Sequence, residues 1–116
     1  MSNLNDETII RAIRDGDEAA IGQVMDRYSR LLWSVVSAVL HNTASEQDVE
    51  ECVADVFIHL WENPDSYDPG RGKLKAWLCV VARNRAVDRY RELSRRSDVP
   101  LEDTLIADRI GAADRV

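Results

Sequence analysis

Apolar residues recur at three- and four-residue steps along almost the whole sequence, the spacing that places side chains on one face of an α-helix. The strict apolar-polar alternation of strands does not appear. The sequence therefore predicts an all-α protein, a compact bundle of about four helices whose last helix is long and basic. At 116 residues the chain can bury one real core and is too short for two domains.

Turn and capping residues set the expected ends of the first two helices. A short helix over roughly residues 6–15 should end at Gly16, a usual C-terminal cap residue. Asp17 can cap a second, long helix that reaches about His41. The face that this helix should bury carries Ile21, Val24, Met25, Tyr28, Leu32, Val35 and Val39.

The third helix should begin after Ser45, where Ser45-Glu46-Gln47-Asp48 approximates a capping box, and end at about Glu62 because Pro64 prevents continuation. Its inward face carries Val49, Cys52, Val53, Val56, Phe57 and Leu60. Its outward face carries Glu51, Asp55, Ile58 and Glu62. An acidic outer face is usually only solvated, and the isoleucine within it is the one hint of a docking surface.

A loop rich in Pro and Gly, residues 63–72, precedes the fourth helix at about residues 73–95. The first half of this helix aligns an apolar stripe of Leu74, Trp77, Leu78 and Val81. The same steps then lead to Asn84, Arg85, Asp88 and Glu92. Because buried charge is costly without partners, we expect the C-terminal half to project from the bundle and present its charges to a partner.

The loop and the fourth helix form a basic segment in an otherwise acidic chain. Residues 70–96 carry nine Lys and Arg against two acids, whereas residues 1–69 have a net charge of −10 and residues 97–116 one of −3. Such a segment suits nucleic acid, since cations neutralise phosphates and aromatic rings stack on unpaired bases for ~1–3 kcal/mol per base. The alternative is a solvated helix end whose charge suits the helix dipole. The basic loop and the polar turn of the helix favour DNA or RNA.

Other kinds of site find no support in the sequence. Cys52 and Cys79 lie in apolar helical stretches without a Cys-x-x-Cys pattern, so we expect reduced packing residues. His41 and His59 have no partner at zinc-ligand spacing, and no catalytic motif occurs, so no metal, cofactor or enzyme activity is expected. No apolar stretch has the length of a membrane span, and the N-terminus lacks a signal-peptide pattern, so the expected location is the cytoplasm.

Three segments, in order, resemble region 2 of the bacterial extracytoplasmic-function (ECF) sigma factors over roughly Asp17 to Arg96. Residues 17–21, DEAAI, resemble the opening D-x-x-A-F of that family. Residues 48–61, DVEECVADVFIHLW, resemble its D-A-E-D-L-x-Q-E-V-F-L-x-L-W helix. Tyr67-Asp68, followed by residues 75–91, KAWLCVVARNRAVDRYR, resembles F-D…W-L-x-x-I-A-R-N-x-x-x-D-x-x-R. Each segment alone is weak, but three at the right spacing are highly specific.

The resemblance implies a non-catalytic subunit of RNA polymerase that recognises the −10 promoter element and helps to melt it. In this family the acidic third helix docks on the clamp helices of the β′ subunit of core RNA polymerase. By motif position and by the outward face described above, the expected polymerase-binding residues are Glu51, Ala54, Asp55, Ile58 and Glu62. Glu51 stands where Asp is usual, Ala54 where Gln is usual and Asp55 where Glu is usual, so the carboxylates remain and the amide is absent.

For DNA, the resemblance implies that the loop at residues 63–73 captures a base flipped out of the non-template strand, while the fourth helix meets the duplex edge and the opened strand. The expected DNA-binding residues are Tyr67, Arg71, Lys73, Lys75, Trp77, Arg83, Asn84, Arg85, Asp88, Arg91 and Arg95. Trp77 lies on the apolar stripe, so we expect it mainly in the core. We interpret Asn84 as a residue that stabilises the loop rather than one that touches the strand.

On this resemblance residues 1–96 form the region 2 domain, and residues 97–116 begin a linker, partly ordered or disordered. We therefore expect no domain that reads the −35 element (region 4) within these 116 residues. The family is commonly held inactive by an anti-sigma factor that covers the same surfaces. A second hypothesis is therefore an interaction module whose acidic face binds an anti-sigma factor or another helical partner. A helical repressor ranks last because no convincing helix-turn-helix is present.

Overall fold

The structure, a computed structural model, describes residues 5–96. Its helices are α1 (Asp6–Arg14), α2 (Glu18–Leu40), α3 (Glu46–Glu62) and α4 (Leu74–Arg96), with short 3-10 turns η1 (His41–Thr43) and η2 (Pro64–Ser66). Residues 5–96 contain no β-strand, so the all-α prediction is confirmed, and each helix end lies within about one residue of its predicted place. The predicted linker at residues 97–116 lies outside the described residues.

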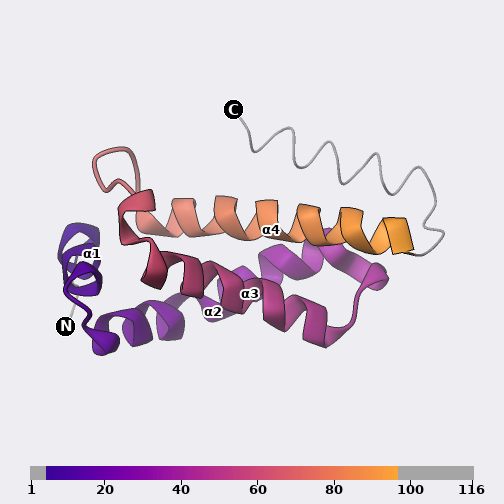
Figure 1. Cartoon of the computed structure of the whole chain (residues 1–116), viewed down its shortest axis with the longest axis horizontal. Helices are drawn as coiled ribbons and strands as arrows, with labels where there is room; N and C mark the ends of the chain where they lie inside the picture. The colour runs from indigo at the N-terminus through magenta and orange to yellow at the C-terminus, as the bar shows by residue number, and fades with distance from the viewer. Residues whose placement is uncertain (1–4, 97–116) are drawn as a thin grey trace.

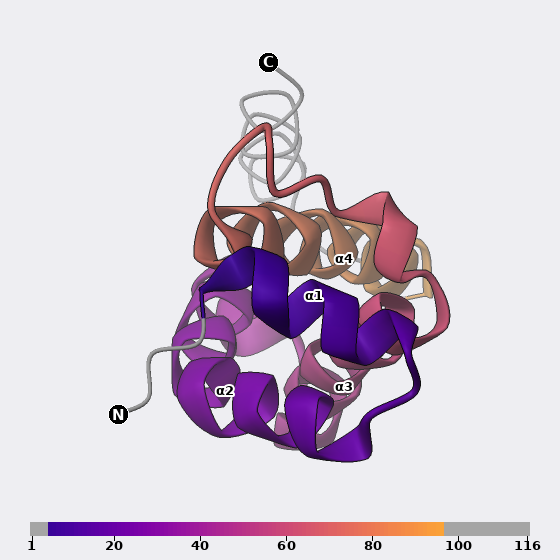
Figure 2. The same cartoon turned by 90° about the vertical axis from the view of Figure 1, so that its left-hand side faces the viewer.

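Helices α2, α3 and α4 form the body of the bundle, and each packs against the other two. Figure 1 shows α4 running along α2 and α3 for most of its length, with α1 across one end. Seen from that end in Figure 2, α1 crosses in front of the other helices, and the loop between α3 and α4 rises beside it. Helix α1 contacts both α2 and η2, so it lies against the start of that loop.

The helix starts carry the caps that the sequence predicts. The Asp17 carboxylate accepts the Ala19 N–H at the start of α2. Ser45 and Asp48 form a reciprocal capping box at the start of α3. Gly16, with φ of 81°, turns the chain between α1 and α2 in a backbone conformation that a side chain would strain.

The core matches the predicted inward face of α3 and most of that of α2. All six predicted positions on α3 are buried, Cys52 among them. Cys79 is half-buried against the core and both thiols are free, which confirms the packing role. Met25 is a correction, because its side chain is 42% exposed. The buried face of α2 runs through Val24, Leu32 and Val36, and Met25 lies beyond its edge.

The prediction that the second half of α4 projects from the bundle is wrong. Ala82, Ala86, Val87 and Tyr90 are all buried, and α4 packs on α2 and α3. The true stripe continues from Leu78 through the two alanines, whose small side chains allow close packing without a strongly apolar signal. Asn84 and Asp88 lie on the exposed side of the helix instead.

Candidate nucleic-acid and polymerase interfaces

The loop that leads into α4 is anchored by Tyr67. Its side chain is only 2% exposed, and its hydroxyl donates to the Gly72 carbonyl at 2.8 Å. The hydroxyl also lies 3.4 Å from the Asp6 carboxylate. Burial, and then the nearby Asp6 carboxylate, raise the pKa of Tyr67 to about 12. Tyr67 therefore holds residues 67–72 as a closed loop and does not offer its ring to solvent.

A tight turn lies at the tip of the loop. The Asp68 carbonyl accepts the Arg71 N–H at 3.0 Å, and the Asp68 carboxylate accepts the Gly70 N–H at 2.9 Å. Pro69 occupies the second position, which its fixed φ suits. A Cβ on Gly70 would lie 3.2 Å from the Asp68 carboxylate oxygen, so the turn is compact at this point. The turn leaves the Arg71 side chain exposed.

An open groove of about 360 Å³ lies between this loop and the first turns of α4. It is lined by Ser66, Tyr67, Asp68, Arg71, Gly72, Lys73, Ala76, Trp77 and Val80. The α4 side is apolar, and the loop side carries two exposed cations, Arg71 and Lys73, together with the exposed acid Asp68. The volume falls at the lower end of the range for small-ligand pockets, about 300–1,000 Å³.

Trp77 forms part of the groove wall and part of the core. It is half-buried, and its ring stacks on His59 of α3 with centroids 6.1 Å apart and planes 18° apart. The Tyr67 ring lies 5.7 Å away at 53°. The expectation that Trp77 serves mainly in packing is confirmed. These ring contacts fix the side chain, so the wall it contributes is rigid.

The remaining predicted DNA-binding residues lie on α4 and do not line the groove. Lys75, Asn84, Asp88 and Arg95 are exposed, and Arg83, Arg85 and Arg91 are partly buried. The rise of an α-helix puts Asn84 about 16 Å and Arg95 about 33 Å beyond Lys73. The structure thus gathers Tyr67, Arg71, Lys73 and Trp77 at one place and spreads the others along the length and around the sides of α4. Asn84 lies too far from the loop to stabilise it, so that interpretation is wrong.

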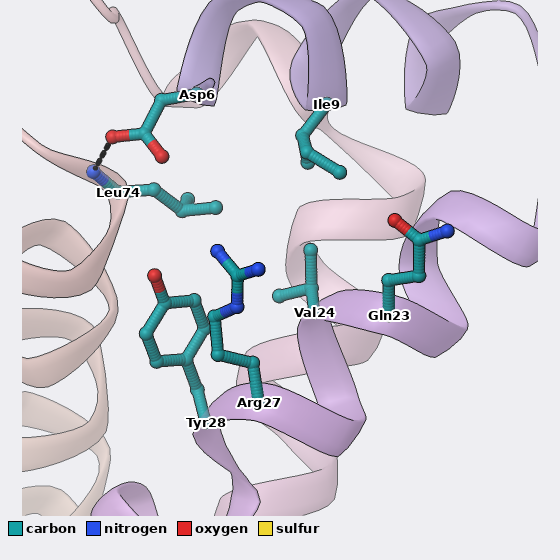
Figure 3. A pocket seen from close by; sticks show the side chains of 7 residues that line it. All are labelled: Asp6, Ile9, Gln23, Val24, Arg27, Tyr28 and Leu74. Carbon is teal, nitrogen blue, oxygen red and sulfur yellow. Dashed lines mark hydrogen bonds between the residues drawn. The ribbon is translucent and has the colours of Figure 1, made fainter. Parts of the chain in front are cut away.

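Two residues that matter to this geometry were missed from the sequence, and Asp6 is the first. Its carboxylate accepts the Leu74 N–H at 2.9 Å, which satisfies the first amide of α4. Amides that open a helix favour an anionic group, and here a carboxylate of the chain itself occupies that position. Figure 3 shows Asp6 and Leu74 at the rim of a small pocket of about 20 Å³, with the side chains of Arg27 and Tyr28 reaching toward them from α2.

Arg89 is the second missed residue. One guanidinium nitrogen lies 2.8 Å from the Asp48 carboxylate and 3.3 Å from that of Glu51, and another lies 3.5 Å from Glu92. Its side chain is 23% exposed, so these contacts tie α4 to α3 in a partly desolvated setting. The Ser45 backbone N–H lowers the pKa of Asp48, against the effect of burial, and the Ser45 hydroxyl and Arg89 lower it further.

The outward face of α3 has the exposure that the sequence predicts. Glu51, Ala54, Ile58 and Glu62 are exposed, Asp55 is partly buried, and Ile58 reaches 50% exposure. Glu51 is not a solitary charge, because it contacts Arg89 and accepts from the Gln47 amide at 3.3 Å. A groove of about 290 Å³, lined in part by Asp55, separates this face from the charged side of α4.

Two further findings concern membrane-spanning helices and metal sites in the described residues. Across residues 5–96, no helix is both long and apolar enough to cross a membrane. In the same range, no three His, Cys, Asp or Glu side chains gather as a metal site would require.

Comparison with known proteins identifies the family to which this sequence belongs. The sequence model of the Sigma-70 region 2 family matches residues 24–96. The ECF RNA polymerase sigma factor SigK of Mycobacterium tuberculosis (strain ATCC 25618 / H37Rv) is 29% identical over 85 residues, which are 73% of this chain and 44% of the relative. The protein of the same name from Mycobacterium sp. (strain KMS) is 32% identical over 85 residues, 73% of this chain and 42% of the relative.

No solved structure matches the chain. The chain spans less than half the length of the curated relatives it matches. The family match covers most of α2 and all of α3, the loop and α4, which are the elements that carry the two candidate interfaces. The chain therefore belongs to the sigma-70 region 2 family, and its relatives place it among the ECF sigma factors.

Proposed function

We propose that this chain acts in transcription initiation as the part of a sigma factor that docks on core RNA polymerase and recognises and helps melt the −10 promoter element. The observation that carries the proposal is the groove between the loop and α4, with apolar side chains on one side and, on the other, two cations that outnumber the single acid Asp68. In this role the chain breaks and forms no covalent bond. It supplies sequence specificity to the polymerase, which does the chemistry.

The groove suits a single base that has left the stack. Ala76, Trp77 and Val80 offer an apolar wall to the flat face of a base, and Arg71 and Lys73 can neutralise the phosphates beside it. Holding the extruded base offsets an unstacking cost of a few kcal/mol, which favours the melted state. Because Tyr67 is buried, we assign it to shaping the groove rather than to stacking on the base.

The cations that follow along α4 suit the backbone of the same strand and of the adjoining duplex. Lys75 and Arg95 are exposed on this helix, at about 30 Å from each other by the helical rise. Phosphate contacts fix position and carry no sequence information, whereas a base pocket reads sequence. The groove at the loop therefore supplies base specificity, and the cations along α4 supply affinity that does not depend on sequence.

The outward face of α3 is the proposed surface for the β′ clamp helices. Ile58, half exposed among Glu51, Asp55 and Glu62, gives an apolar anchor inside a polar rim, the usual anatomy of a protein interface. The same features would suit an anti-sigma factor, which is the second candidate partner. The two partners would then compete for one surface, and such competition would keep the sigma factor inactive until the inhibitor leaves.

The test measures the two activities separately. Binding to core RNA polymerase is measured first, and then binding of the chain with core enzyme to single-stranded −10 non-template oligonucleotides that carry each base in turn. The proposal expects binding to core and a base preference that changes when residues 67–73 are exchanged. Binding to core with no preference among bases would refute −10 recognition, and failure to bind core would leave the interaction-module hypothesis in its place.

A further inference from the structure

Helix α1 lies before the residues that match the family, which begin at residue 24, yet it contacts both ends of the loop. At the exit of the loop, the Asp6 carboxylate accepts the Leu74 N–H at 2.9 Å and lies 3.4 Å from the Tyr67 hydroxyl. At the entrance, the Arg14 guanidinium lies 2.6 Å from the Asp65 carboxylate of η2. One helix thus holds the two flanks of the groove.

Asp6 supplies a capping group that the residue next to α4 in the sequence cannot supply. The residue before the helix is Lys73, whose side chain has no hydrogen-bond acceptor and so cannot cap it. Leu74 is 1% exposed, so its side chain is packed away from solvent next to an amide that still needs an acceptor. A carboxylate at this point also complements the positive end of the helix dipole. Asp6 therefore acts as the cap of a helix that begins 68 residues later.

The cap bears directly on the shape of the groove. Lys73 and Gly72 line the groove, and they lie between the Tyr67 anchor and the capped amide of Leu74. Tyr67 fixes the Gly72 carbonyl, and Asp6 fixes both the Tyr67 hydroxyl and the helix start. Removing the Asp6 carboxylate would free the exit of the loop while the core below it stays packed. The Arg14–Asp65 pair is largely exposed, so its hold on the entrance is weaker.

We propose that α1 holds the loop in the shape that captures a base and that Asp6 is a positioning residue for the groove. The inference rests on the proposed function, because it concerns the same groove. It adds that the competent shape of the loop depends on a side chain outside the matched family region. A protein whose loop is competent for only part of the time binds the base more weakly by that fraction.

The experiment compares two −10 non-template oligonucleotides on the full chain with core enzyme, one intact and one abasic at the captured position. Asp6→Ala should weaken binding of the intact oligonucleotide by roughly three- to tenfold and leave the abasic one unchanged. Asp6→Asn keeps an acceptor oxygen and should restore most of the loss. Glu7→Ala removes the neighbouring exposed acid and is the matched control, which should behave as the parent chain.

A second readout guards against a simple folding defect. Amide hydrogen exchange at Leu74 should become faster in Asp6→Ala, while amides in the middle of α4 keep their protection. Equal losses on the intact and abasic oligonucleotides, or no loss on either, would overturn the role of Asp6. If the parent chain does not distinguish the two oligonucleotides, the base pocket itself is refuted, and the role of α1 in base capture is refuted with it.

Discussion

Replacing Tyr67 by Phe removes one buried hydroxyl and keeps the ring that packs 5.7 Å from Trp77. No cavity forms, so the change in stability comes from the hydrogen bond to the Gly72 carbonyl at 2.8 Å. A hydrogen bond of this kind contributes roughly 0.5–1.5 kcal/mol, and the carbonyl left behind can reach water at the groove. At neutral pH we expect Tyr67→Phe to lower the free energy of unfolding by about 1 kcal/mol.

The same variant has a distinctive pH dependence. In the folded chain the pKa of Tyr67 is raised from its ordinary value of 10.0 to about 12, so folding favours the neutral hydroxyl. The stability this provides is fully present below about pH 10 and is lost as the pH rises toward 12. A shift of about two units corresponds to roughly 2–3 kcal/mol. Phe cannot titrate, so Tyr67→Phe should escape this loss and become the more stable protein near pH 12.

The assay is urea unfolding of both proteins at intervals from about pH 8 to pH 12, with the difference in unfolding free energy plotted against pH. The other titrating groups are common to both proteins, so the difference isolates Tyr67. We expect this difference to change sign within the interval. A difference that stays constant across the whole interval would refute the buried, hydrogen-bonded hydroxyl as the anchor of the loop.

Three further predictions concern charged residues. Arg89→Ala should lower the unfolding free energy by about 1 kcal/mol at neutral pH. Because the pKa of Asp48 is lowered in the folded chain, this loss of stability should shrink as acid protonates the Asp48 carboxylate. Urea unfolding at neutral and acid pH measures it, and an equal loss at both would contradict the Arg89–Asp48 pairing. Reversing the charge of Glu51 and Asp55 together should weaken co-elution with core polymerase while the thermal melt stays cooperative, and normal co-elution would refute docking through α3. Arg95→Ala should weaken all oligonucleotides alike and flatten the salt dependence by roughly one unit, and a change in base preference would contradict a phosphate contact.

The fold could be predicted wherever the apolar period was strong. On α3, large apolar residues and acids occupy opposite faces, and every predicted core position is buried. On α4 the period weakens after Leu78 because two of the four buried positions that follow, Ala82 and Ala86, are alanines; the other two are Val87 and Tyr90. Alanine is too small to mark a face, so the more visible charges at neighbouring positions suggested a projecting helix. The prediction failed where small side chains interrupt the apolar period of a buried face.

The candidate site could likewise be predicted from the sequence only in part. The loop and its cations could be predicted because Pro, Gly and charge lie close together in the sequence. Asp6 and Arg89 could not, since their partners are 68 and 41 residues away and a pairing at that distance leaves no periodic signal. Tyr67 was predicted as a DNA contact from its place in the loop, and only the structure shows that the side chain turns inward.

Photo-crosslinking from the groove tests base capture most directly. Ala76 is exposed and lines the groove, so a photoreactive amino acid at this position would lie within reach of a captured base. Met25, exposed on α2 and outside the groove lining, is the matched control position. With core enzyme and promoter DNA, we expect crosslinks from position 76 to one nucleotide of the −10 non-template strand and none from position 25. Crosslinks from position 76 that are absent, or spread along the duplex as they are from position 25, would contradict it.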